Sequence, residues 1–214
     1  MTLAVNSIET SPIQVHNQKQ EQILQGAMQV FFRDGYAGTS MDRVAIEAGV
    51  SKQTIYSHFQ DKEGLFKALV ERITIARYNT LFESAQLHDD PELLLRQLAE
   101  TYFLKVAVDR DYLSLLRLVI AESARFPEMA KLYTQSVIQH GRQMLGQYFD
   151  AHPELGIGDS KAAAHIFFGS LVSFVVVQEI LHGKEIIPLS SESLVNSLID
   201  LFLARIRINN KLAV

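Results

Sequence analysis

The chain contains no cysteine among its 214 residues. This absence excludes disulfide bonds, thiolate metal sites and cysteine nucleophiles. It also fits a reducing cytosol, where disulfides are rare. The N-terminal stretch MTLAVNSIETSPIQVHNQ lacks both a basic region and a sustained apolar run, so it is not predicted to be a signal peptide. We therefore expect a cytoplasmic protein, and we expect residues 1–16 to form a flexible tail.

The sequence also lacks the common signatures of catalysis. It has no G-x-S-x-G elbow and no Walker loop. Its seven histidines are scattered without metal-ligand spacing. Glu179 and His182 match half of a di-iron helix motif, but no other histidine has a glutamate three residues before it. We therefore predict that the protein is not an enzyme and has no metal site and no cofactor.

The sequence also has no excess of basic residues. The chain holds 20 Lys and Arg against 24 Asp and Glu, a net charge of −4. Residues 1–80 contain eight residues of each sign, and the acidic excess lies in residues 81–214, with twelve basic and sixteen acidic residues. Any affinity for nucleic acid must therefore come from the local placement of cations and not from overall charge.

No alternating strand pattern of useful length occurs, and nearly every segment has helical periodicity. The sequence predicts an all-α fold with a domain division near residue 85. A helix–turn–helix domain with a linking helix would occupy residues 17–85, and a helical bundle that dimerises would occupy residues 86–214. The expected helices are Lys19–Arg33, 40–48, Lys52–Phe59, one from Asp61 past residue 75, Pro91–Val108, Arg110–Arg125, Pro127–Asp150, Ser160–His182 and Ser190–Ile208.

Residues 40–59 have the pattern of a helix–turn–helix. Ala45 and Ala48 are small enough to let two helices cross closely, and Gly49 can adopt the left-handed conformation of a tight turn. On the following helix Ile55 and Phe59 share one edge and would be buried. The opposite, polar face would then point outward, either toward a duplex or simply toward solvent.

The outward face has the chemistry of a DNA reader. Gln53 can make a bidentate contact to adenine, and Thr54 or Ser57 can contact base edges. Four further side chains are placed to hold phosphates, which fix register without reading sequence: Lys52, Tyr56, His58 and Lys62. The N-terminus of the preceding helix, at Thr39 and Ser40, offers free backbone N–H groups for another phosphate. Either of these two residues could cap that helix, and Thr39-x-x-Asp42 has the spacing of a capping box.

A series of short motifs runs from about residue 19 to residue 70: Phe31-Phe32, the glycine before Tyr36, Thr39, Val44-Ala45, Ala48-Gly49-Val50-Ser51, Thr54-Ile55-Tyr56, His58-Phe59 and Lys62-Glu63-x-Leu65. Together these motifs closely resemble the signature of the TetR family of bacterial transcriptional regulators. This resemblance implies that Tyr56 and Lys62 contact phosphates and that Lys52, Gln53 and Thr54 lie at the groove. It also implies an all-helical second domain that dimerises and holds a small effector.

The stretch Ser160–His182 supports dimerisation independently. From residue 162 to residue 177 its only polar side chains are His165, Ser170 and Ser173. A helix that is apolar all round must be buried all round. A bilayer is one way to bury it, but the run is shorter than a span requires, so a helix shared between its own core and a partner subunit is preferred. The residues predicted at the dimer interface are His165, Gly169, Ser173, Leu194, Leu198 and Phe202.

The effector pocket is the least determined part of the prediction. Arg117 and Glu122 lie in an apolar stretch, where they could form a structural salt bridge or face a ligand. Four aromatic residues could line a pocket or belong to an ordinary core: Tyr102, Phe103, Tyr133 and Phe168. Residues 116–132 are also similar to a C-terminal domain of one TetR subgroup.

These observations predict a ligand-responsive transcriptional regulator, a repressor more than an activator. It would bind a palindromic operator as a homodimer and would be released by a small-molecule effector. Its partners would be double-stranded DNA, a second copy of the chain and an unknown effector, with no membrane. The alternative is a helical module that binds a protein partner and has no affinity for DNA.

Overall fold

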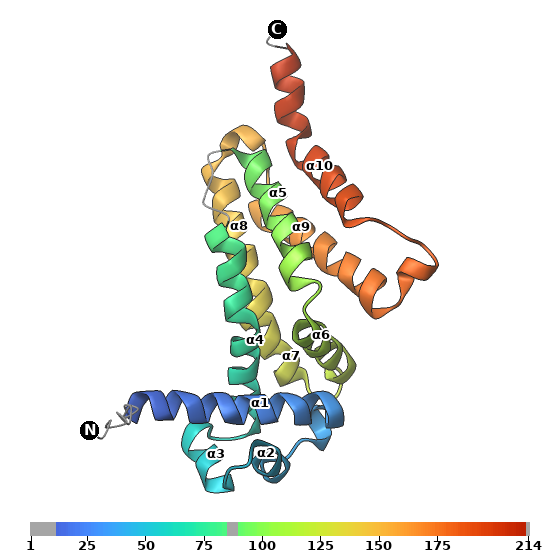
Figure 1. Ribbon diagram of the computed structural model, residues 1–214. Helices are drawn as coiled ribbons and strands as arrows, with labels where there is room; N and C mark the ends of the chain where they lie inside the picture. The colour runs from blue at the N-terminus through green and yellow to red at the C-terminus, as the bar shows by residue number, and fades with distance from the viewer. Residues whose placement is uncertain (1–11, 85–89, 213–214) are drawn as a thin grey trace, which may run out of the picture. The chain divides into compact units, whose positions relative to one another are not determined.

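In the computed structural model the described residues are 12–84 and 90–212, with side chains described over 17–74 and 90–204. Every regular element within these ranges is a helix, which confirms the predicted fold class (Figure 1). The chain divides into two compact units, Met1–Leu69 and Val70–Val214. The division lies inside helix α4 (Lys62–Ser84), whereas the sequence places a boundary at the end of that helix, near residue 85.

The N-terminal unit contains α1 (Pro12–Gly38), α2 (Met41–Ala48), α3 (Lys52–His58) and the first part of α4. Helix α1 begins at Pro12, inside the expected tail, and residues 1–11 of that tail lie outside the described residues. The predicted stop at Gly35 corresponds to a kink, where φ is 72° and ψ is 174°. Glycine suits this position because the positive φ is unfavourable for residues with a side chain.

Three aromatic rings form the centre of this unit. Phe31 stacks on Tyr36 with ring centroids 5.7 Å apart, and both rings meet the edge of Phe66 at 5.4 Å. Phe66 comes from α4, so this helix is tied to the N-terminal unit through its first two turns. This contact explains why the boundary between the units lies within α4 and not at its end.

Helices α1 and α2 approach each other closely at Gly26. A Cβ atom on Gly26 would lie 2.8 Å from the Cβ and the backbone nitrogen of Ala48. Beside this contact, the side-chain amide of Gln22 donates a hydrogen bond of 2.7 Å to the backbone carbonyl of Ala48. The predicted close crossing at the small residues of α2 therefore also requires a glycine on α1. The sequence pattern alone does not identify Gly26 as that glycine.

The C-terminal unit is built from residues 70–84 of α4 and the helices that follow. Aspartates that cap the N-termini of three of these helices, Asp90, Asp109 and Asp159, accept hydrogen bonds from backbone N–H groups. The elements are α5 (Pro91–Thr101), η1 (Tyr102–Val106), α6 (Arg110–Glu122), α7 (Pro127–Tyr133), η2 (Thr134–Gln139), α8 (His140–Ala151), η3 (Pro153–Leu155), α9 (Ser160–Val175), η4 (Val176–Ile180), η5 (Gly183–Glu185) and α10 (Ser191–Leu212).

Three of the helices expected to be continuous contain a π-helical turn. Segment η1 follows α5, η2 joins α7 to α8, and η4 follows α9. A π turn is wider than an α turn and shifts the side chains that follow it around the helix axis. The apolar periodicity of the sequence predicts the extent of these helices but gives no sign of the wider turns.

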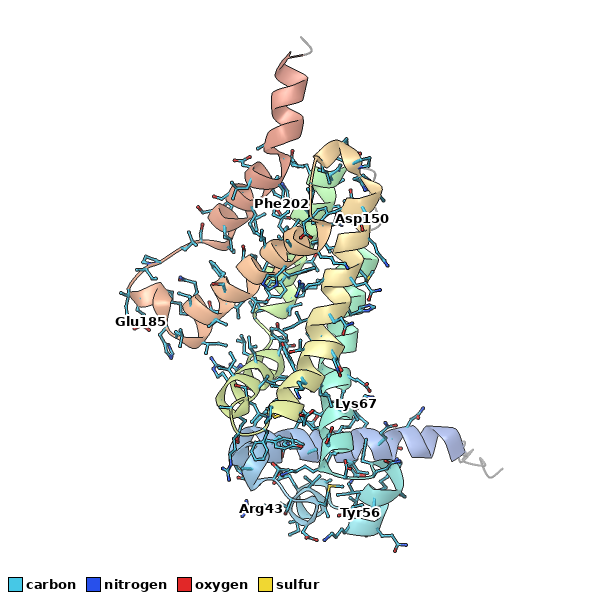
Figure 2. The ribbon with its side chains drawn as sticks, turned by 180° about the vertical axis from the view of Figure 1, so that it is seen from behind. Arg43, Tyr56, Lys67, Asp150, Glu185 and Phe202 are labelled. Atoms are coloured by element: carbon cyan, nitrogen blue, oxygen red, sulfur yellow. The ribbon has the colours of Figure 1, made fainter. Side chains whose placement is uncertain are left out.

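Helix α9 packs into the core of its own unit. Phe167, Leu171 and Val175 are fully buried along one face. On α10, Phe202 stacks on Phe149 of α8 at 5.6 Å and meets the edge of Phe167 at 5.8 Å (Figure 2). By length and composition Ser160–Ile180 alone among the described helices could cross a membrane, but core helices of globular proteins have the same properties.

The Gly26 contact generates a stability prediction. We expect Gly26→Ala to lower the free energy of unfolding by about 1–3 kcal/mol, because the added methyl group overlaps Ala48 and forces the helices apart. The matched control is Gly64→Ala on α4, where the nearest atom to an added Cβ is 3.5 Å away. The control should be neutral or stabilising by roughly 0.5–1 kcal/mol. Urea unfolding followed by circular dichroism measures both, and equal effects would contradict the close approach.

Candidate nucleic-acid interface and ligand cavity

The turn between α2 and α3 is fixed by backbone hydrogen bonds. Gly49 ends α2 with φ 63° and ψ 38°, the left-handed conformation that the sequence predicts. Its N–H donates to the carbonyl of Ile46 at 3.2 Å, and the N–H of Val50 donates to that of Ala45 at 3.0 Å. Ser51 then caps α3 by accepting a hydrogen bond of 3.0 Å from the N–H of Thr54. The two helices are thus held at a defined angle by local interactions.

Helix α3 is anchored on one side and open on the other. Ile55 is fully buried and Phe59 is only 5% exposed, while Gln53, Tyr56 and Ser57 are exposed. Figure 2 shows Tyr56 at the side of the unit opposite α1. Seven helical residues span about 10 Å, which fits a major groove about 12 Å wide. The described geometry therefore has the form of a recognition helix.

The hydroxyl groups of α3 are engaged within the helix. The Thr54 hydroxyl lies 2.7 Å from that of Ser51, and Ser57 donates to the carbonyl of Thr54 at 2.8 Å. Gln53 has an exposed amide with two donors and an acceptor. Of the side chains predicted to read bases, Gln53 is therefore presented most directly.

Lys52 is paired with a carboxylate of the neighbouring helix. Its ammonium group donates to Asp42 Oδ2 at 2.9 Å, and this hydrogen bond raises the pKa of Lys52. Lys52 is therefore fully charged at neutral pH. A phosphate must nevertheless compete with Asp42 for the same ammonium group, so the pair weakens the contact that the sequence predicts.

Lys62 holds the connection between α1 and α2. Its ammonium group donates to the carbonyls of Tyr36 and Thr39 at 2.9 and 3.2 Å, and it lies 4.5 Å from the centre of the Tyr36 ring. Burial of that ring, together with the nearby charges of Glu63 and Asp61, raises the pKa of the tyrosine hydroxyl. The structure thus gives Lys62 a positioning role in addition to the phosphate contact implied by the family resemblance.

The start of α2 differs from the predicted capping box. Thr39 is only 4% exposed and its hydroxyl donates to the carbonyl of Gly35 at 2.7 Å, so its side chain points inward and does not cap the helix. Ser40 is the cap, accepting a hydrogen bond of 3.3 Å from the N–H of Arg43. The capping-box prediction from Thr39 is therefore wrong, because the kink in α1 places the carbonyl of Gly35 within reach of that hydroxyl. His58 is half-buried, with its ring beside that of Phe59.

Two arginines near this surface are not among the predicted contacts. Arg43, labelled in Figure 2, donates to Asp34 at 3.2 Å and to the carbonyl of Gly38 at 3.0 Å. Arg33 donates to Asp34 at 3.0 Å and to Glu47 at 2.9 Å. The hydrogen bond from Arg33 and its charge, followed by the charge of Arg43, lower the pKa of Asp34. These pairs agree with the zero net charge of residues 1–80.

A cavity of about 380 Å³ lies within the C-terminal unit. All three π-helical segments contribute to its wall, through Tyr102 and Val106 of η1, Val137 and Ile138 of η2, and Val176 of η4. The other described lining residues are a mixture of apolar, small and polar ones: Thr74, Tyr112, Gly141, Arg142, His165, Phe168, Gly169, Val172 and Ser173.

The cavity contains only part of the predicted pocket. Tyr102 and Phe168 line it, but Arg117, Glu122 and Tyr133 do not. Arg117 is exposed and donates to the carbonyl of Glu179 at 3.1 Å, at the end of the π-helical segment η4. Phe103 packs edge-on against Phe174 at 4.9 Å. Arg142, which has no apolar run around it to single it out, belongs to the cavity and is absent from the prediction.

The residues predicted at the dimer interface fall into two groups. His165, Gly169, Ser173 and Leu194 line a second, open groove of about 660 Å³ along α9, η4 and the start of α10. Leu198 is only 4% exposed and Phe202 packs on the two core rings described above, so these two side chains face their own subunit. Their placement at a dimer interface stays a prediction, because apolar periodicity does not distinguish a helix face that meets its own core from one that meets a partner.

The short, anchored α3 with its exposed polar face defines a helix–turn–helix DNA-binding protein. The family described as "Bacterial regulatory proteins, tetR family" matches residues 23–69. The family described as "AefR-like transcriptional repressor, C-terminal domain" matches residues 94–207, more than half of the chain. The protein belongs to the TetR family of DNA-binding transcriptional regulators.

The similarity to other proteins extends over most of the chain. The transcriptional regulator YvkB of Bacillus subtilis, itself described as uncharacterized, is 25% identical over 187 residues, which cover 85% of this chain and 94% of that protein. A TetR-family regulator from Mesorhizobium loti has a structure with a TM-score of 0.67 and 28% identity, covering 88% of this chain and 96% of its own. The flavonoid-responsive regulator FrrA has a TM-score of 0.71 and 26% identity over the same shares.

The pairing of Lys52 with Asp42 leads to a prediction for DNA binding. We expect Asp42→Asn to strengthen binding to duplex DNA at every sequence, by roughly two- to fivefold, because the substitution frees the ammonium group of Lys52 from a weak, exposed ion pair. The slope of log affinity against log salt should steepen by about one.

Fluorescence anisotropy at several salt concentrations measures both quantities. The control is Glu128→Gln, which breaks a similar exposed pair with Lys131 in the C-terminal unit and should change neither. An unchanged salt slope in Asp42→Asn would show that Lys52 does not contact phosphate.

Proposed function

We propose that the protein is a ligand-responsive repressor that binds a palindromic operator as a homodimer and is released by a small-molecule effector in the cytoplasm. The observation that carries this proposal is α3 itself, where buried Ile55 and Phe59 leave Gln53 and Tyr56 exposed in a chain of the TetR family. Repression is supported by the AefR-like repressor domain and by BepR, a repressor of Brucella suis that is 32% identical over 78 residues, 36% of this chain and 37% of that protein.

The proposed contacts divide by their chemistry. Gln53 would read a base pair through its exposed amide, with Thr54 and Ser57 beside it. Phosphate contacts would come from Lys52, Tyr56, His58 and Lys62, and from the backbone at Ser40, the start of α2. The buried hydroxyl of Thr39 leaves only its backbone for such a contact. These residues would form the DNA-binding part of residues 17–85.

Dimerisation through α9 and α10 is supported by exposed apolar groups. Ile166 on α9 is 57% exposed and Leu201 on α10 is 74% exposed. In the adjoining groove, the Oε1 atom of buried Gln178 accepts no hydrogen bond from the described part of the chain. A partner subunit would cover both features. Two recognition helices about 34–36 Å apart would then read the halves of a palindrome, which requires a dimer.

The effector would bind in the 380 Å³ cavity. Its volume lies near the lower end of the range of about 300–1,000 Å³ for small-molecule sites. Thr74 of α4 forms part of its wall, and α4 begins at Lys62, which holds the connection before α2. An effector that binds one position of α4 better than another would shift the spacing of the recognition helices. The similar regulator FrrA is described as flavonoid-responsive, which supports a ligand response in this protein.

The contacts on α3 and α4 are tested by substitution. We expect Tyr56→Phe and Lys62→Ala to weaken binding at all sequences, because both remove a phosphate contact and Lys62→Ala also removes the hydrogen bonds that hold the connection between α1 and α2. Gln53→Ala should instead relax the preference at one base pair in each half-site, at a cost of about 1–3 kcal/mol for the preferred base. Titration of labelled DNA from upstream of the protein's own gene, at fixed salt, measures these effects.

Wild-type behaviour in all three variants would mean that the contacts are wrongly assigned. Failure of the wild-type protein to bind this DNA or any genomic fragment would instead favour a module that binds protein partners.

The dimer interface has a separate test. We expect Leu201→Glu, alone or with Ile166→Glu, to produce a folded monomer, because a buried unpaired charge would destabilise the interface. Sedimentation velocity measures the oligomeric state. Ile120→Glu on α6, where the side chain is also half-exposed, is the control and should remain dimeric. A dimer that persists in Leu201→Glu would contradict the proposed interface.

A further inference from the structure

The described residues around the cavity supply positive charge and no negative charge. Among the described residues that line it, only Arg142 and His165 carry or can carry a positive charge, and none of them is an aspartate or glutamate. The remaining wall is dominated by valine, isoleucine and aromatic side chains. Such a chamber favours a ligand with an apolar body and an acceptor or anionic group.

Arg142 is half-buried and lacks a counter-ion in the described part of the chain. Arg33, Arg43 and Arg96 all form ion pairs, whereas no described carboxylate forms one with Arg142. A partly desolvated guanidinium without a partner is unfavourable, and an anion that reaches it removes that penalty. The position of Arg142 therefore marks where the charged end of a ligand would lie.

Arg142 also stands at the opening of the chamber. It and Ile138 line a neighbouring open groove of about 680 Å³ on the surface of the same unit. The other residues of that groove are mostly polar: Thr134, Gln139, Gln143, Gly146, Gln147, Asp150 and Lys161. Asp150 of α8 is visible in Figure 2. The wall thus changes from apolar to polar at Arg142, as the surface of an amphipathic molecule does.

The π-helical segments are an independent indication that the chamber binds a ligand. π turns are rare and occur frequently at functional sites. Here η1, η2 and η4 lie on three different helical stretches, and each sends at least one side chain into this cavity.

We propose that the effector is an amphipathic monoanion, with its apolar body in the chamber and its carboxylate or similar group on the guanidinium of Arg142. This inference rests on the proposed ligand response and names the chemistry of that same site. At roughly 30 Å³ for each water-sized group, the chamber holds on the order of a dozen non-hydrogen atoms. A straight-chain carboxylate of about ten carbons is therefore a suitable probe.

The experiment compares three probes of equal length at sub-micellar concentration, decanoate, 1-decanol and decylamine, by isothermal titration calorimetry on the full-length protein. We expect decanoate to bind about tenfold or more tightly than 1-decanol, because a hydrogen bond to a charged group is stronger than one between neutral groups. Decylamine should bind weakest. Decanoate should also release the protein from its operator.

Two variants locate the interaction. Arg142→Gln should abolish the preference for decanoate over decanol and leave decanol binding unchanged, while Arg110→Gln, an exposed arginine outside the cavity, should behave as wild type. Val172→Phe should fill the chamber and weaken all probes, with thermal unfolding confirming that the variant folds.

Equal binding of decanoate and decanol, or unchanged decanoate binding in Arg142→Gln, would overturn the inference. Absence of binding by all three probes would also overturn it, yet leave the proposed function intact if the protein still binds its operator. Decanoate binding by a protein that binds no operator would overturn the proposed function instead.

Discussion

The structure of the DNA-binding unit depends on the missing side chain of Gly26. Because nothing projects from α1 at that position, the backbone of α2 at Ala48 can lie directly against it, and Gln22 can bond to the last carbonyl of the helix. The tight turn at Gly49 then carries this placement to α3. The exposed face of the recognition helix is therefore set by contacts on the opposite side of the unit, where no DNA would be touched.

In the same unit, several cations that could contact DNA phosphates also bond to groups of the protein itself. Several of its exposed cations bond to carboxylates or carbonyls of the protein, among them Arg33, Arg43 and Lys52. Such pairs contribute little to stability at the surface. They do reduce the charge available to phosphates, so the protein relies on the placement of a few contacts more than on general attraction. The proposed release from the operator by an effector would be easier for a protein whose attraction to DNA is limited in this way.

The sequence predicts the all-α fold, the helix–turn–helix and its buried anchors, because short-range periodicity and turn chemistry determine these features. It does not predict the cavity, because the π turns that shape it interrupt helices without any compositional sign. The same limit applies to Leu198 and Phe202, because the sequence does not indicate whether their apolar side chains contact a partner or their own core. The sequence does not predict the role of Arg142 for a related reason: its half-buried place in the cavity wall, without an ion pair to any described carboxylate, is a property of the three-dimensional structure.

If an effector binds the guanidinium of Arg142 as proposed, its binding would also change how long the protein survives in the cell. An occupant that neutralises this guanidinium stabilises the native state by RT ln(1 + [L]/Kd), which is about 2.7 kcal/mol at a hundredfold excess over Kd. Cellular proteases attack chains in proportion to how often they open. Loaded molecules would therefore turn over more slowly than empty ones, and the pool of regulator would grow with its own signal.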